Sequence, residues 1–323
     1  MKIKNHTVRH VLLRIVQAVL VLWAAYTVTY IILNLLPADP LALILQAQGT
    51  DISTLSASQI ATLRHSYGLD AAPLQRYFTM LLAAIHGDFG NSYTYGTSVL
   101  HLIAVRVSST IVISLLSILL SVVLSFALAF WVSLTRQHWL RKALAVLPAF
   151  AASVPSFWVG LLLMQIFCFW LGWLPSGGMK GPASMVLPVI TMSVPTAAML
   201  SQLLINGFES IMDSNYVTVA RARGFSKRHF LLAHVSKNAS LPALTILGLL
   251  VGETVTGAIV AETVFSRQGL GMLIQQAVTN QDIPVVQGAV VLAAGAFVVV
   301  NLIVDLIYPL LDPRLTRTKE AVA

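Results

Sequence analysis

Long apolar runs with few charges dominate the chain. Six of them are long enough for a membrane-spanning helix, which needs about 20 predominantly apolar residues. They cover residues 15–36, 107–134, 143–179, 181–208, 239–264 and 285–308. The first is too long for the core of a signal peptide, so we expect it to be retained. The pattern predicts an all-α integral membrane protein with six transmembrane helices.

The stretch 37–106 is too polar to span a membrane and has its own helix signals. Ser56 and Gln59 have capping-box spacing, and Gly68 is placed to end the helix that they start. Pro73 can begin a second helix, in which apolar residues recur on one face up to Gly87. These helices either cap the ends of the membrane helices or form a docking surface for a soluble partner. A further short helix is expected after Gly269, within the polar stretch 265–284.

These segments define the predicted organisation. Residues 1–36 form an N-terminal arm and the first transmembrane helix, and residues 37–106 form a periplasmic helical region. Residues 107–323 form the core with the other five transmembrane helices, and the polar stretch 209–242 within it is the main cytoplasmic loop.

Composition places this body in a lipid bilayer. The chain is 57% hydrophobic and only 10% charged, with a mean hydropathy of +0.82. Soluble globular chains are about 25% charged. A soluble enzyme, a disordered tail and a free nucleic-acid binder are therefore excluded, and membrane lipid is the natural solvent. The single Cys168 excludes a disulfide framework within the chain and a cysteine-rich metal cluster.

The net charge is +8, and the distribution of the basic residues along the chain predicts the membrane topology. Of the 20 Lys and Arg residues, 15 fall in the segments that share a side with the two termini. Cytoplasmic loops carry an excess of Lys and Arg, so both termini are predicted to be inside. The basic residues are scattered over four short segments, and we therefore expect no nucleic-acid partner.

The loop 209–242 carries the most specific pattern. Asn215 can cap a short helix that Gly224 can end, and Ser226 can cap a second helix. Ala220 and Gly224 lie four residues apart, so a partner backbone could approach closely on that side of the first helix. Basic residues surround this surface, and charge alone would fit an ordinary positively charged inner loop. The charges are Arg221, Arg223, Lys227 and Arg228.

The motifs resemble a known family when they are taken in order along the chain. The loop residues Ala220, Arg221, Ala222, Arg223, Gly224, His234, Asn238 and Pro242 look like the coupling loop of ATP-binding-cassette importer permeases. The form Ala-Arg-Ala-Arg-Gly is similar to the dipeptide, oligopeptide and nickel branch. Further matches to that branch are residues 36–40, 87–92, 154–158, 262–265, 269–271 and 312–314. Arg267 and Gln268 depart from it, since the branch more often has Trp-Pro there.

The resemblance implies a type I importer subunit in the bacterial cytoplasmic (inner) membrane. Its partners would be a second homologous permease subunit, two ATPase subunits and a periplasmic or extracellular solute-binding protein. The sequence has no phosphate-binding loop of the form Gly-x-x-x-x-Gly-Lys-Ser/Thr. We therefore expect no cofactor bound by this chain, with ATP and magnesium on the partner ATPases, and no catalytic residues.

Ionisable groups within the apolar runs are candidate functional residues, because a charge at mid-membrane costs about 2.5–3.5 kcal/mol on insertion scales. Glu253 lies in the fifth run and would line the translocation path or form a buried hydrogen bond to a neighbouring helix. Gly248 and Gly252 on the same helix suit close helix packing. Glu262 is expected at the outer surface in an interfacial role. The histidines show no clustering that supports a metal site.

Two alternatives to an importer permease remain open: an ion-coupled secondary transporter or channel that acts without an ATPase, and a membrane-embedded enzyme. The resemblance fits either short peptides or nickel and other metal chelates as cargo. The short turn at 172–182 and the stretch 45–49 lean slightly toward a metal chelate of the opine type.

Overall fold

The computed structural model describes residues 2–35, 39–47, 49–214, 217 and 226–311. The described chain consists of helices and connecting loops and divides into two compact units. The first unit is formed by Met1–Ser108 and Gly269–Val298, and the second by Ser109–Gln268 and Val299–Ala323.

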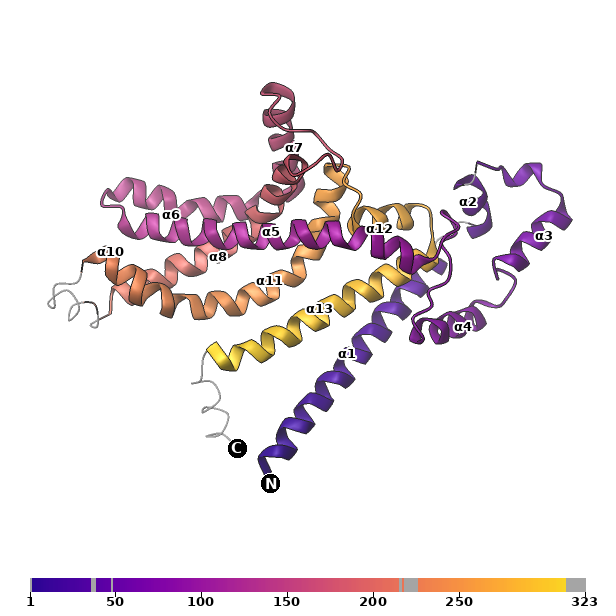
Figure 1. Ribbon diagram of the computed structural model, residues 1–323, viewed down its shortest axis with the longest axis horizontal. Coiled ribbons are helices and arrows are strands. Elements are labelled where there is room, and N and C mark those ends of the chain that lie inside the picture. The colour runs from indigo at the N-terminus through magenta and orange to yellow at the C-terminus, as the bar shows by residue number, and fades with distance from the viewer. Residues whose placement is uncertain (1, 36–38, 48, 215–216, 218–225, 312–323) are drawn as a thin grey trace. The chain divides into compact units, whose positions relative to one another are not determined.

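The first unit contains the N-terminal helix and the polar region that follows it (Figure 1). Its elements are α1 (Lys2–Leu35), α2 (Pro40–Ala47), the 3-10 turn η1 (Ile52–Thr54), α3 (Ala57–Ser66), α4 (Pro73–Ile85), the start of α5 (Val99–Leu134), α12 (Leu270–Thr279) and the first half of α13 (Ile283–Leu311).

Local sequence signals determine the helix ends in this region. The capping box of Ser56 and Gln59 is present at the start of α3, as the sequence predicts. Gly68 and Gly87 follow α3 and α4 with φ of +65° and +82°, a backbone conformation that favours glycine. The predictions that Pro73 begins a helix and that a short helix follows Gly269 are also confirmed.

Helix α4 packs against the C-terminal half of α1 through a tyrosine cluster. Tyr26, Tyr30 and Tyr77 are buried together, and the Tyr30 hydroxyl donates to the Pro73 carbonyl at 2.6 Å. The apolar residues of α4 do not form one buried face, because Leu74, Phe78, Leu82 and Ile85 are 53–70% exposed.

The second unit contains the remaining long helices. Its elements are the rest of α5, α6 (His138–Ser153), α7 (Ser156–Met164), the π-helical η2 (Gln165–Trp170), α8 (Ala183–Met212), α10 (Lys227–Phe230), the π-helical η3 (Leu231–Val235), α11 (Ser236–Val264) and the end of α13. Helix α5 packs on α8 through a stripe of buried serines: Ser121 and Ser125 donate to the carbonyls of Ser193 and Ala197. Small polar side chains of this kind let membrane helices approach closely.

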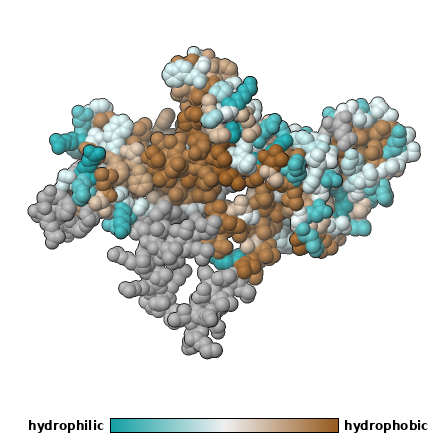
Figure 2. Space-filling view, in the orientation of Figure 1, coloured by the Kyte–Doolittle hydropathy of each residue, from teal (hydrophilic) through white to brown (hydrophobic). Residues whose placement is uncertain are grey.

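Four helices of the described chain are long and apolar enough to span a membrane, and two bent helix pairs bring the number to six if each pair is one span. One pair is α6 with α7 and η2, bent by 101°. The single straight run predicted at 143–179 is therefore broken. Val154, which precedes Pro155, has ψ of 126°, because a residue before proline avoids helical conformation. Apolar side chains cover much of the visible surface of the long helices, whereas hydrophilic ones gather over α2 to α4 (Figure 2).

Candidate functional site

The base of the loop 209–242 is built into the hydrophobic core of the second unit. Phe208 in the last turns of α8, Val217, and Phe230, Leu231 and Val235 in the second part of the loop are all at most 4% exposed and belong to one cluster. The parts of the chain before and after residues 218–225 are therefore held on one packed surface. Ser226 caps the second part of the loop as expected, since its hydroxyl accepts from the amide of His229 at 3.3 Å. That part then continues through η3 into α11 and is not a separate helix.

Two contacts fix the geometry of this base. A Cβ atom on Gly207 would lie 3.2 Å from the Cβ of Ala239, so α8 and α11 approach as closely as a glycine allows. On the surface, Arg141 of α6 forms an ion pair of 2.7 Å with Glu209 of α8, and both side chains are more than 40% exposed. The loop thus emerges from a tightly packed helix pair.

The structure describes only part of the predicted coupling residues. Ala220, Arg221, Ala222, Arg223 and Gly224 lie outside the described residues. His234 lies in η3, and Asn238 and Pro242 are exposed in the first turns of α11. The prediction that these residues contact an ATPase therefore stays a prediction.

Glu253 is exposed on α11, so it is not a carboxyl buried within this chain. The helix bends by 42° between Ile246–Thr254 and Thr256–Val264, directly after Glu253. The hydroxyl of Thr254 donates to the carbonyls of both Leu250 and Val251, a pattern that often bends helices. Gly248 is buried and Gly252 is half-buried on the same helix.

A buried polar cluster, which we call the 262/267 cluster, lies at the other end of α11. Glu262 is fully buried and accepts a hydrogen bond of 2.6 Å from Thr110 of α5. Arg267 is 1% exposed and donates to the hydroxyl of Ser109 at 2.9 Å. Burial lowers the pKa of the Arg267 guanidinium, and the nearby Glu262 carboxylate opposes that shift. The expectation that Glu262 is interfacial is therefore wrong, because the cluster joins α5 to α11.

A second buried carboxylate organises the first unit. Asp282 is fully buried; its side chain accepts from the Ser92 hydroxyl at 2.5 Å and from the amides of Tyr93 and Thr94 at 3.2 and 3.0 Å. It thereby ties the loop after α4 to the start of α13. The motif at 87–92 belongs to the family resemblance, but nothing local in the sequence pairs it with Asp282. Within the described ranges, no three His, Cys, Asp or Glu side chains gather as a metal site would require.

Comparisons with known proteins bear on the whole chain. A family model described as binding-protein-dependent transport system inner membrane component matches residues 121–317. A probable peptide ABC transporter permease protein of Sinorhizobium fredii is 31% identical over 314 residues, which cover 95% of this chain and 98% of the relative. A glutathione transport system permease protein of Salmonella typhimurium is 30% identical over 304 residues, which cover 94% and 97% of the two chains.

Solved structures agree on the fold. A chain of the MetNI methionine ABC transporter, in an inward-facing conformation, superposes with a TM-score of 0.56 at 15% identity. The superposition covers 65% of this chain and 96% of the other. At that identity the likeness shows a shared arrangement of helices.

Proposed function

The chain belongs to the family of inner membrane components of binding-protein-dependent transport systems, and on that basis we propose short peptides as its cargo. It is the permease subunit of an ATP-binding-cassette importer in the bacterial inner membrane, and separate subunits hydrolyse the ATP. The alternatives of an ion-coupled transporter and a membrane-embedded enzyme are thereby set aside.

One observation carries the proposed cargo. The chain aligns over more than nine-tenths of its length with permeases whose names specify peptide or glutathione transport. Glutathione is itself a tripeptide, so both names describe small molecules with amide bonds and a free carboxylate. A metal chelate stays the second candidate, because the sequence features at 45–49 and 172–182 lean toward it.

Members of this family work with an ATPase and a solute-binding protein. Within the proposed complex, this chain pairs with a second homologous permease, and two ATPase subunits bind ATP and magnesium. We place the ATPase contact at residues 220–224. The packed base beneath the loop supports this placement, because Phe208 and Phe230 anchor the chain in one core cluster before and after residues 220–224.

Transport by the assembled complex tests the cargo. The permeases, ATPases and binding protein would be reconstituted into liposomes, and uptake of labelled dipeptides and tripeptides would be compared with uptake of a labelled nickel chelate. ATP-dependent uptake of the peptides alone is expected. Uptake of the nickel chelate without peptide uptake would contradict the proposed cargo while leaving the family unchanged.

Orientation is tested with single cysteines. The predicted topology places Ser58 outside and Ser226 inside, and both residues are exposed. With Cys168 replaced by serine, a membrane-impermeant maleimide added outside spheroplasts should label Ser58→Cys and not Ser226→Cys. Labelling should reach Ser226→Cys only after the membrane is permeabilised. Equal labelling of both variants in intact spheroplasts would refute the predicted topology.

Glu253 is proposed to line the translocation path. It is exposed beside the bend of α11, and a carboxylate at this depth needs water or a polar partner outside this chain. Glu253→Gln should lower peptide uptake by roughly tenfold, the effect of losing one charged hydrogen bond, with complex yield and basal ATP hydrolysis unchanged. The matched control is Asp70→Asn, which also removes one carboxylate charge, at an exposed position of the other unit. Full uptake with Glu253→Gln would exclude the path-lining role.

A further inference from the structure

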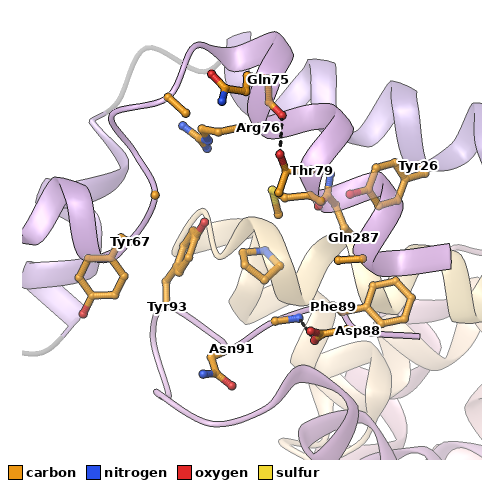
Figure 3. A pocket seen from close by; sticks show the side chains of 16 residues that line it. Tyr26, Tyr67, Gln75, Arg76, Thr79, Asp88, Phe89, Asn91, Tyr93 and Gln287 are labelled. Atoms are coloured by element: carbon orange, nitrogen blue, oxygen red, sulfur yellow. Dashed lines mark hydrogen bonds between the residues drawn. The ribbon is translucent and has the colours of Figure 1, made fainter. Parts of the chain in front are cut away.

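The first unit contains a cavity of about 350 Å³ that no part of the proposed transport mechanism uses. Its walls come from α1, the end of α3, α4, the loop 88–93 and the start of α13, all within this unit (Figure 3). Ligand pockets in proteins are typically about 300–1,000 Å³. The cavity is thus large enough for a small ligand or for the polar end of a larger one.

Two buried nitrogen atoms in the cavity wall lack acceptors. Gln287 of α13 is 1% exposed and lies close to the Tyr26 hydroxyl, but its Nε2 makes no hydrogen bond of ordinary geometry to a described residue. The Nη2 atom of Arg76 of α4 is also buried, and it too has no acceptor among the described residues. An unsatisfied buried donor costs about 1–3 kcal/mol, and more when it is charged. An oxygen acceptor that reached either nitrogen would remove the cost at that nitrogen.

The neighbouring groups favour an acceptor that carries negative charge. Figure 3 shows Arg76 on the same side of the cavity as Tyr93, while Gln287 lies on the other side, near Tyr26. Burial raises the pKa of Tyr93, and the positive charge of Arg76 opposes that shift. The Tyr93 hydroxyl therefore remains protonated at neutral pH and can also donate.

The acidic group in the wall is already engaged. Asp88 also lines the cavity, and its Oδ1 accepts a hydrogen bond of 2.8 Å from the amide of Gly90. The other acidic group near Tyr93 is Asp282, which is occupied by Ser92 and two backbone amides. Both carboxylates thus accept hydrogen bonds from residues of the loop 88–94. By contrast, Nη2 of Arg76 has no acceptor among the described residues.

We propose that this cavity binds an oxyanion, a carboxylate or phosphate, with Arg76 supplying the charge and Gln287 a second N–H donor. Two sources fit this chemistry. One is the carboxylate of a transported peptide, which rests on the proposed function. The other is the phosphate of a lipid head group, since Tyr26 in the wall belongs to the apolar helix Arg14–Leu35.

Thiol protection measures binding directly. Thr79 is exposed and lines the cavity, so Thr79→Cys in a Cys168→Ser background reports access to it. The assembled complex in a sugar-based, phosphate-free detergent, stripped of lipid and without ATP or binding protein, would be labelled with N-ethylmaleimide. The probes are acetyl-dialanine, its neutral amide, and phosphatidylglycerol.

The expected result is that an acid protects the cysteine and the neutral amide does not. Protection by acetyl-dialanine assigns the site to a cargo carboxylate, and protection by phosphatidylglycerol alone assigns it to a lipid phosphate. Arg76→Gln should weaken protection roughly tenfold or more, as expected for the loss of a charged hydrogen bond. The matched control is Arg106→Gln, since Arg106 of the same unit is already paired with Gln276 and stacks on Tyr95.

Gln287→Leu provides a second variant in case Arg76→Gln does not assemble. It removes one donor without removing charge, so protection should weaken several-fold while the complex assembles normally. Absence of protection by either acid, or equal protection in the wild type and in both variants, would overturn the proposal and leave a cavity filled with water. The labelling assay does not depend on peptide transport, so its failure would be distinct from failure of the proposed cargo.

Discussion

Arg267→Met is expected to destabilise the permease strongly. Arg267 and Glu262 are both buried, and the substitution would remove a positive charge that acts electrostatically on the Glu262 carboxylate. Removing one of two neighbouring buried groups of opposite charge typically costs about 3–5 kcal/mol. The transition temperature of the detergent-solubilised complex should fall by several degrees, as measured by intrinsic fluorescence during heating.

Two further variants separate the charge effect from the loss of packing. Glu262→Gln combined with Arg267→Met should recover most of the lost stability, because no uncompensated charge then remains. Arg141→Met is the matched control, since the ion pair between Arg141 and Glu209 is exposed and such pairs contribute about 0–1 kcal/mol. A transition temperature for Arg267→Met equal to that of Arg141→Met would refute the role of the buried pair.

Ala220→Glu and Gly224→Asp should abolish coupling to the ATPase. Both would place an anion on the small-residue side of the predicted coupling helix, where a partner backbone is expected to approach. We expect uptake to fall by at least about tenfold, the equivalent of 1.4 kcal/mol, with the membrane subunits still assembled. Co-purification of the ATPase and peptide uptake would be measured on the same preparation.

The control places the same charge elsewhere. Ala61→Glu adds a carboxylate at an exposed position of α3, and it should leave ATPase binding and uptake unchanged. If Ala220→Glu and Gly224→Asp both behaved like Ala61→Glu, the coupling contact would have to lie outside residues 220–224.

The sequence predicts those parts of the fold whose causes are local. The capping box at Ser56 and Gln59 covers only four residues, and the candidate membrane spans follow from the length and composition of the apolar runs alone. The break in the third span is also local, but the run 143–179 contains no charge there, so only Val154 and Pro155 signal it.

Features that depend on distant partners could not be found in this way. Glu262 looks interfacial from its position at the end of an apolar run, but its partner Thr110 lies 152 residues away in the sequence. Asp282 and Ser92 are separated by 190 residues. The single sequence clue to the 262/267 cluster is that Arg267 stands where the family more often has Trp-Pro. The unsatisfied donors of Arg76 and Gln287 likewise become visible only when α4 and α13 are placed around one cavity.

The contact between Gly207 and Ala239 has a consequence for how force would pass through this subunit. A Cβ atom on Gly207 would lie only 3.2 Å from the Cβ of Ala239, so α8 and α11 are in close contact near the loop. We therefore expect a displacement of the loop to move α8 and α11 together. Helix α11 also carries the bend beside Glu253, so we expect a rotation at the base to reach the residue that we propose to line the path.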